Sequence, residues 1–354
     1  MRARLIVVVA AASAALAVSV SGQSGKHLNA MVDLLAQGKP VFGLSAPSAR
    51  GGGGGARGGR GAAATGAGAA TSTAPTTPPP PPPPAAPPKT PLELAKDTLA
   101  HPESDYFFSG SMERGVDPAI TSLTAYADAL VEAGAIVKAP FHHLLAPLSV
   151  KTPNISGDPS KATENISRQL NIGVASISFV EVDNAQELEQ GIAAMRFKSK
   201  GGTRPDAIGD APKYWGLTEK QYRDKADVWP LNKNGELVAW AIVETKEGIA
   251  NVRSIAQVKG LGVLIPGAGT LGGVFSTTGA DGRRVRDDVA WEAAIQTILA
   301  ACKEFKIPCG YPANANDIEM RMKQGFSVFI IQAFNEGGFK AVEIGRQVSG
   351  RDKK

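Results

Sequence analysis

The fold is indicated most clearly by residues Leu237–Val274, which read LVAWAIVETKEGIANVRSIAQVKGLGVLIPGAGTLGGV. This stretch contains an apolar run at 238–243, a segment with apolar residues at near-helical spacing at 249–258, and a second apolar run at 261–265. A short continuous apolar run is typical of a strand buried on both faces, as in a parallel sheet. The stretch therefore predicts a strand–helix–strand unit with a right-handed crossover.

A carboxylate and a glycine-rich turn follow these two predicted strands. Glu244 comes directly after the first strand, and the Pro-Gly-Ala-Gly turn at 266–269 comes after the second. In parallel α/β folds the chemistry lies at the carboxyl ends of the strands. We therefore expect Glu244 and the turn to lie side by side on one face.

The same alternation of strand and helix patterns runs through most of the chain. Further strands are predicted at residues 40–44, 105–108, 135–140, 173–180, 307–311 and 326–331. Helical patterns separate them, and the first helix, at 26–38, precedes the first strand. Eight strands that alternate with helices predict an α/β fold of the (β/α)8 TIM barrel type. Without the first ninety residues, roughly 260 remain, which is close to the usual length of such a barrel.

The first 22 residues have the pattern of a signal peptide. Arg2 and Arg4 form a positive start, residues 5–20 are apolar, and small residues around 20–22 offer a cleavage site. An uncleaved membrane anchor is the alternative, although the apolar run is short for a bilayer span. The pattern predicts a secreted or periplasmic protein, with membrane contact only if the signal is retained.

Residues 46–90 form a low-complexity segment that cannot supply a hydrophobic core. It consists of a Gly/Arg/Ala tract followed by a run of prolines at 78–84. The piece before it is too small to be a domain. We therefore interpret 46–90 as a disordered Gly/Pro-rich insertion in a loop of one barrel, which is formed by residues 26–45 and 91–350.

Charge and cysteine content narrow the possible functions. The chain has 354 residues and a formal net charge of +5, without a basic stripe that contains interleaved aromatic residues, so nucleic-acid binding is not expected. Cys302 and Cys309 are the only cysteines, and no histidine lies near them to complete a metal site. We favour two buried thiols, with a disulfide as the alternative in an oxidising compartment.

Several motifs together carry a resemblance to a known family. They are LLAQGKPVFGL at 34–44, MRF at 195–197, VET at 243–245 followed by Asn251, and IPCG at 307–310. In this order they resemble the HpcH/HpaI aldolase group, the metal-dependent class II 2-oxo-acid aldolases related to the citrate lyase beta chain. The resemblance covers nearly the whole chain except the signal and the insertion.

The resemblance implies a barrel fold, assembly into a homo-oligomer and a carbon–carbon lyase activity. In that family a divalent Mg or Mn, held by a Glu and an Asp, binds a 2-oxo acid and stabilises the enolate formed on cleavage. A His held by an Asp performs acid–base chemistry. An Arg after the third strand contacts the oxo acid.

Transferred to this sequence, the metal site is incomplete. Glu244 matches the metal-binding Glu. The turn at 266–271 contains no carboxylate, and Gly269 stands where the Asp is expected. Glu181, which follows the predicted fourth strand, is the candidate second ligand.

The acid–base motif also differs. The family's Asp-x-Glu-His corresponds to Ser111-Met112-Glu113-Arg114, so Glu113 is retained and Arg114 replaces the His. A guanidinium stays protonated and cannot act as a base, but it can bind a carboxylate in a bidentate way. His142, in the loop after the predicted third strand, is a candidate replacement for the missing His.

Substrate binding is assigned to a cation and a turn. Lys138 takes the place of the Arg after the third strand, and the backbone amides of Gly267, Ala268 and Gly269 complete an anion pocket. Two functions follow. The first is a lyase for 2-oxo or 2-hydroxy acids, and the second is a non-catalytic or altered barrel that binds a small carboxylate outside the cytoplasm.

Overall fold

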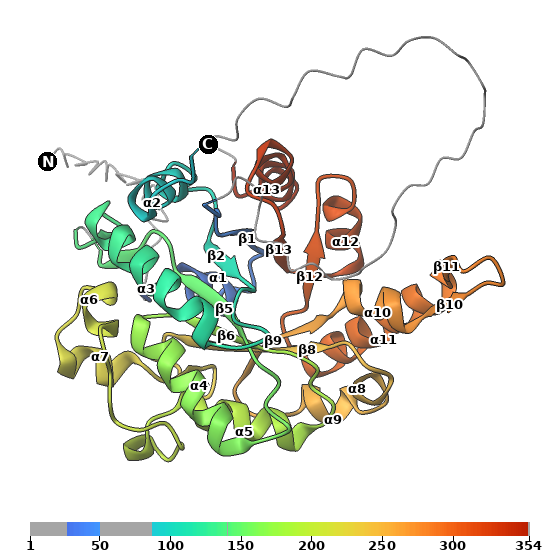
Figure 1. Ribbon diagram of the computed structural model, residues 1–354, viewed down its shortest axis with the longest axis horizontal. Coiled ribbons are helices and arrows are strands. Elements are labelled where there is room, and N and C mark those ends of the chain that lie inside the picture. The colour runs from blue at the N-terminus through green and yellow to red at the C-terminus, as the bar shows by residue number, and fades with distance from the viewer. Residues whose placement is uncertain (1–26, 50–86, 140, 353–354) are drawn as a thin grey trace, which may run out of the picture.

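The computed structural model describes residues 27–49, 87–139 and 141–352. Its centre is a curled parallel sheet with helices around it (Figure 1). The sheet has nine strands, of which β7 (Val228–Trp229) is short and pairs in parallel with the first two residues of β8. The other eight are β1 (Val41–Ser45), β2 (Tyr106–Ser109), β5 (Leu148–Thr152), β6 (Ser176–Phe179), β8 (Leu237–Val243), β9 (Leu261–Pro266), β12 (Gly310–Ala313) and β13 (Val328–Ile331).

These strands pair in chain order and always in parallel. β1 lies between β2 and β13, and the series continues through β5, β6 and β8 to β9. A parallel bridge joins Leu264 to Cys309, and the Leu264 amide donates to the Pro308 carbonyl at 3.1 Å. The two ends of the series therefore meet, which is a TIM-like arrangement and confirms the predicted α/β class.

Helices surround this sheet, and the first of them packs against the residues of the barrel interior. They are α1 (Ala30–Ala36), α2 (Pro91–Leu99), α3 (Asp117–Glu132), α4 (Pro159–Ile172), α5 (Ala185–Met195), α6 (Ala211–Trp215), α7 (Glu219–Lys225), α8 (Lys246–Ala250), α9 (Val252–Ala256), α10 (Ala268–Val274), α11 (Asp288–Phe305), α12 (Ile318–Gln324) and α13 (Glu336–Val348), with a 3₁₀ turn at Lys198–Lys200. Thr90 and Glu93 form a capping box that starts α2. The predicted helix at 249–258 is divided at Asn251, whose side chain donates to the Asp183 carbonyl at 2.9 Å.

The prediction of the third barrel strand was wrong. Of the described residues 135–139, only Ile136–Val137 (β3) form a strand, and this strand pairs antiparallel with His143–Leu144 (β4) outside the barrel. The third barrel strand is β5, which pairs with β2 and β6. Its sequence LSVKT lacks a continuous apolar run because Ser149 and Lys151 point toward the barrel interior.

The barrel interior has its own apolar core, separate from the layer between sheet and helices. Met31 and Val32 of α1 join inward residues of the strands, among them Tyr106 and Trp240. The Tyr106 hydroxyl donates to the Phe329 carbonyl at 2.8 Å, and its ring fills the space beside Gly43. A Cβ at Gly43 would lie 2.1 Å from this ring, so the first strand requires glycine at that position.

The preference for two free thiols was also wrong, because Cys302 and Cys309 form a disulfide. Lys306 adopts a left-handed conformation, with φ 56°, at the end of α11 and turns the chain back. This turn brings the two Cα atoms to 5.6 Å, within the normal range for a disulfide. A two-stranded hairpin, β10 (Ser276–Thr278) with β11 (Arg284–Arg286), projects from the body beside α11 (Figure 1).

Predictions for the first part of the chain lie mostly outside the described residues. The signal peptide at 1–22 and nearly all of the insertion at 46–90 fall in the ranges 1–26 and 50–86. Among the residues that are described, no helix has the length and apolarity needed to cross a membrane.

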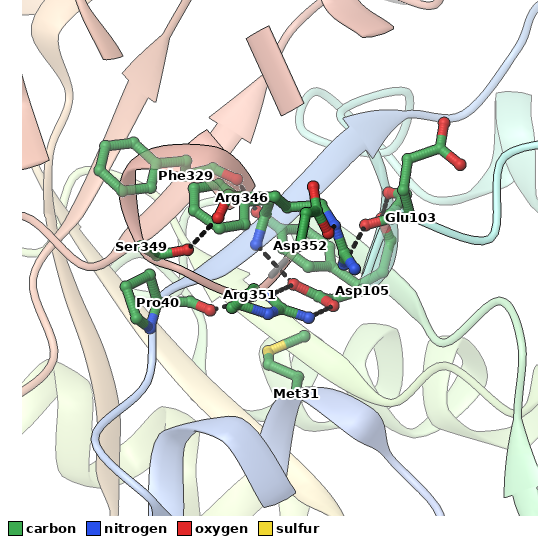
Figure 2. A network of polar contacts seen from close by, with 12 residues as sticks. Met31, Pro40, Glu103, Asp105, Phe329, Arg346, Ser349, Arg351 and Asp352 are labelled. Carbon is green, nitrogen blue, oxygen red and sulfur yellow. Dashed lines mark hydrogen bonds and ion pairs between the residues drawn. The ribbon is translucent and has the colours of Figure 1, made fainter. Parts of the chain in front are cut away.

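An ion pair near the end of the chain ties it to the beginning of the barrel (Figure 2). Both Arg351 Nη atoms bind the Asp105 carboxylate at 2.6 Å, and Arg351 also donates to the Pro40 carbonyl at 2.9 Å. Asp105 also accepts from the Phe42 amide at 2.8 Å and is only 7% exposed. The pair thus connects the segment after α13 with β1 and the start of β2.

We predict that Arg351→Ala lowers the free energy of unfolding by about 3 kcal/mol, because it leaves a buried carboxylate without its cation. Arg253→Ala is the matched control, since Arg253 forms an exposed ion pair with Glu304. The control should cost no more than about 1 kcal/mol. Urea unfolding of both variants provides the measurement. An equal decrease in the free energy of unfolding would show that the Arg351–Asp105 pair stabilises the protein no more than an exposed ion pair does.

Candidate active site

The centre of the candidate site is the Glu244 carboxylate. Val238, Trp240 and Ile242 of β8 face the barrel interior, and the alternation of a strand continues this direction to Glu244. Glu244 is 3% exposed, and its Oε1 accepts from the Glu181 amide at 3.1 Å. A hydrogen bond from the Thr270 side chain also reaches the carboxylate.

Two further charged side chains, Glu113 and Lys151, lie close enough to Glu244 to change its pKa. Burial raises the pKa of Glu244, and the nearby Glu113 carboxylate raises it further. The Thr270 hydrogen bond, the Lys151 ammonium and the Glu181 amide act in the opposite direction. A buried carboxylate with a raised pKa and a charge partner at a strand end is typical of a catalytic acid or base.

Lys151 is a site residue that the sequence analysis missed. It lies on β5 and its Nζ is 3.0 Å from Glu113 Oε1, with the Lys151 side chain 13% exposed. The Gln169 side chain donates to the Lys151 carbonyl at 2.9 Å and so fixes this end of β5. The sequence LSVKT could have revealed it, because Ser149 and Lys151 alternate with apolar residues and therefore lie on one face of a strand.

Glu181 contributes its backbone to the site, and its carboxylate points elsewhere. Its side chain is exposed and accepts from the Asn154 amide at 2.9 Å. Its φ is 51°, a left-handed conformation that is uncommon outside glycine and costs about 1 kcal/mol. This conformation directs the Glu181 amide to Glu244, so the predicted pairing of the two carboxylates around one metal ion is not what the structure forms.

The glycine-rich turn supports Glu244 sterically. A Cβ at Gly267 would lie 2.6 Å from Glu244 Oε2, so this position requires glycine. The Gly267 amide already donates to the Val243 carbonyl at 2.9 Å and is not available to an anion. Ala268 is buried, and its carbonyl accepts from the Trp291 indole, whereas Gly269 is exposed with open space at its Cβ position.

Two predicted site residues lie at the opposite end of the barrel. Burial lowers the pKa of His142, and the Lys138 and Lys225 charges lower it further. Lys225 pairs at 3.0 Å with Glu236, which precedes β8, whereas Glu244 follows it. His142 and the exposed Lys138 are therefore separated from Glu244 by the length of that strand, because the segment that carries them precedes β5.

Arg114 is near the site in sequence but does not converge on it. Its side chain is exposed, and it makes no ion pair in the described part of the chain. The neighbouring Glu113 does reach the site through Lys151. The structure thus brings together Glu113, Lys151 and Glu244, of which two were predicted.

The donor set fits a resident metal ion poorly. Within residues 27–49, 87–139 and 141–352, no group of three or more His, Cys, Asp or Glu side chains could hold an ion. Glu244 is already bonded by the Glu181 amide and the Thr270 side chain, and the Lys151 ammonium lies in its field. Mg usually requires carboxylate oxygens that are free to coordinate it.

Comparison with known proteins identifies the class. Residues 117–329 match the model of the HpcH/HpaI aldolase/citrate lyase family, and the chain belongs to this family. A relative from Pseudomonas putida, 2-dehydro-3,6-dideoxy-6-sulfogluconate aldolase, is 24% identical over 163 residues. That match covers 46% of this chain and 58% of the aldolase, so the chain spans little more than half of its relative's length.

Solved structures agree on the fold. A family protein from Burkholderia cenocepacia J2315 superposes with a TM-score of 0.57 at 15% identity, covering 92% of this chain and 100% of that one. An HpcH/HpaI aldolase from Desulfitobacterium hafniense DCB-2 gives a TM-score of 0.52 at 13% identity, with coverage of 84% and 87%. The family assignment confirms the resemblance found in the motifs and supports a lyase function in general.

We predict that Glu244→Gln stabilises the protein at neutral pH by on the order of 1 kcal/mol, because it removes a buried charge. A raised folded-state pKa contributes stability below the ordinary value of 4.5, and this contribution is lost as the pH rises through the folded-state pKa. The difference between variant and wild type should therefore vanish in acid. Denaturant unfolding at both pH values measures it.

Glu93→Gln serves as the control of opposite sign. Hydrogen bonds from Thr90 lower the pKa of Glu93, so its contribution is present at neutral pH and is lost as the pH falls through the folded-state pKa. This variant should be less stable than wild type at neutral pH. If both variants shift in the same direction, the burial of Glu244 does not set its charge state.

Proposed function

We propose that this protein is a carbon–carbon lyase that cleaves or forms 2-oxo or 2-hydroxy acids at Glu113, Lys151 and Glu244. The observation that supports it best is the buried Glu244 carboxylate after β8, on which the Lys151 ammonium of β5 acts electrostatically, inside an aldolase-family barrel. In such a barrel, catalytic groups come from the ends of several strands.

Each side chain has a role that its geometry allows. The Lys151 ammonium attracts the negative charge of the oxo acid, and Glu113, 3.0 Å away, holds it in place. Glu244 is the acid–base group, because its burial makes the carboxylate a better proton acceptor than a solvated one. The Glu181 amide and Thr270 fix the Glu244 carboxylate, so little reorganisation accompanies proton transfer.

Metal dependence, with Mg or Mn at Glu244 and Glu181, is the finer expectation that the family resemblance implies. An ion held there would polarise the substrate carbonyl. The exposed Glu181 carboxylate and the bonded Glu244 carboxylate do not favour it, so the roles above are assigned to side chains alone.

Location and assembly are further proposals. Export from the cytoplasm is supported by the Cys302–Cys309 disulfide, since disulfides persist mainly in oxidising compartments. A homo-oligomer is supported by exposed apolar side chains near the projecting hairpin, where Val285 is 62% and Val289 82% exposed. Cell fractionation and the mass of the protein in solution test the two points.

We predict that the protein exchanges the methyl protons of pyruvate with solvent deuterium, because an aldolase must form the carbanion equivalent at that carbon. Proton NMR follows the exchange. Lys151→Ala and Glu244→Ala should each slow it at least about a hundredfold, the usual size of an acid–base contribution. Arg253→Ala, on the outer face of α9, is the control and should exchange at the wild-type rate.

Failure of the wild-type protein to exchange pyruvate, together with no cleavage of any 4-hydroxy-2-oxo acid tested, would overturn the lyase proposal. Binding of pyruvate without exchange would then support the alternative, a barrel that binds a small carboxylate.

We predict that Gly269→Asp raises the affinity for Mn²⁺ by about tenfold or more, equivalent to about 1.4 kcal/mol. A side chain at this position enters open space, and the change supplies the carboxylate that the family resemblance expects there. Gly269→Asn has the same size without the charge and is the matched control. Calorimetric titration measures both, and tight Mn²⁺ binding by the wild type would show that the native residues do hold a metal ion.

A further inference from the structure

The nitrogen of Lys151 is placed as a nucleophile would be. It lies on β5 at the carboxyl ends of the strands, its side chain is 13% exposed, and its Nζ is 3.0 Å from a carboxylate oxygen of Glu113. A second carboxylate, Glu244, is close enough for the Lys151 charge to act on it. An amine flanked by two groups that can exchange protons is an arrangement suited to covalent catalysis.

A lysine at this position allows chemistry that an arginine does not. The family resemblance implies an arginine after the third strand, and the third barrel strand of this chain carries Lys151 instead. A guanidinium binds anions but does not act as a nucleophile, whereas an amine can form a Schiff base with a carbonyl. Gly269 stands where the family resemblance implies the second metal-binding carboxylate, so another means of activating the carbonyl is needed.

A buried hydroxyl beside Lys151 provides an independent observation. Ser178 of β6 is the register partner of Lys151, so the two side chains leave the sheet on the same face. Ser178 is fully buried, and its hydroxyl has no hydrogen-bond partner in the described part of the chain. A buried hydroxyl without a partner is costly, and a substrate oxygen bound next to Lys151 would satisfy it.

We propose that Lys151 forms an iminium with the C2 carbonyl of the 2-oxo acid, so that this barrel works as a Schiff-base aldolase. The inference rests on the proposed lyase function and specifies its mechanism. Glu113 takes a proton from the ammonium, and the Lys151 amine adds to C2 to give a carbinolamine. Glu113 returns the proton to the new hydroxyl, which leaves as water, and the nitrogen keeps the positive charge.

Cleavage then proceeds through the iminium. Glu244 removes the proton of the C4 hydroxyl, the C3–C4 bond breaks, and its electron pair moves into the C2–N system as an enamine. The aldehyde departs, Glu244 returns the proton to C3, and water hydrolyses the iminium, which releases the 2-oxo acid and regenerates the Lys151 ammonium. Atoms and charges balance over the cycle, and no metal or external reductant is required.

Trapping of the iminium tests the proposal. The full-length protein is incubated with pyruvate and sodium cyanoborohydride, with EDTA present throughout. The expected product is an adduct of one pyruvic acid less one water and plus two hydrogens, located by peptide mass mapping at Lys151. Lys138→Arg, which removes a lysine at the other end of the barrel, should give the same adduct.

Two substitutions separate a nucleophile from a simple cation. Lys151→Arg keeps the charge and Lys151→Ala removes it. The proposal expects both to abolish trapping and to slow pyruvate exchange by a similar factor, at least about a hundredfold. Ser178→Ala should raise the pyruvate concentration needed for half-maximal trapping while the adduct stays at Lys151.

The outcomes distinguish this mechanism from the lyase function itself. Exchange that persists in Lys151→Arg, or that EDTA abolishes, without an adduct at Lys151, would overturn the Schiff base and leave the lyase proposal in place. An adduct at Lys151 without exchange or cleavage would support the iminium and overturn the lyase function.

Discussion

Burial of the Glu244 carboxylate is the constraint around which the site is built. Moving a carboxylate out of water costs several kcal/mol unless donors and cations replace the lost hydration. Three groups do so here: the Glu181 amide, the Thr270 side chain and the Lys151 charge. The left-handed backbone at Glu181 and the absence of a side chain at Gly267 follow from the same requirement.

The alternation of side chains in the strands explains why these groups meet. In a parallel barrel, register partners on neighbouring strands share a face, so Ser149 and Ser176, and then Lys151 and Ser178, line the interior together. Apolar residues such as Tyr106 and Trp240 fill other parts of the interior. The charged groups, Lys151 and Glu244, lie at the carboxyl ends of β5 and β8.

The sequence was a good guide to the barrel because seven of its eight strands overlap the segments predicted from apolar residues and turns. The strand that it missed, β5, has polar side chains on its inner face, and one of them is the charged Lys151. This misplaced strand is related to the proposed function, because Lys151, which interrupts the apolar pattern of β5, is also a residue of the candidate site. Polar residues at inward positions cost stability, and they are found where a site needs them.

The site was predicted less well than the fold for a related physical reason. Glu244 and Glu113 could be placed from local sequence, because each directly follows a strand or lies in the loop after it. Lys138 and His142 were assigned to the wrong end because their position depended on the misplaced third strand. The direction of the Glu181 side chain depends on a single backbone angle, which a sequence pattern does not encode.

The charges of the site argue for a change in how the carbonyl is activated. A carboxylate pair can hold a doubly charged ion, whereas Glu113 and Glu244 here flank one ammonium on a side chain that is mostly buried. An added cation would compete with Lys151 for the same two carboxylates, and its approach would be opposed by the Lys151 charge. The chain has Gly269 in place of the expected Asp and Lys151 on β5. These two differences fit together, because the Lys151 ammonium supplies the positive charge that the carbonyl chemistry would otherwise take from a metal ion.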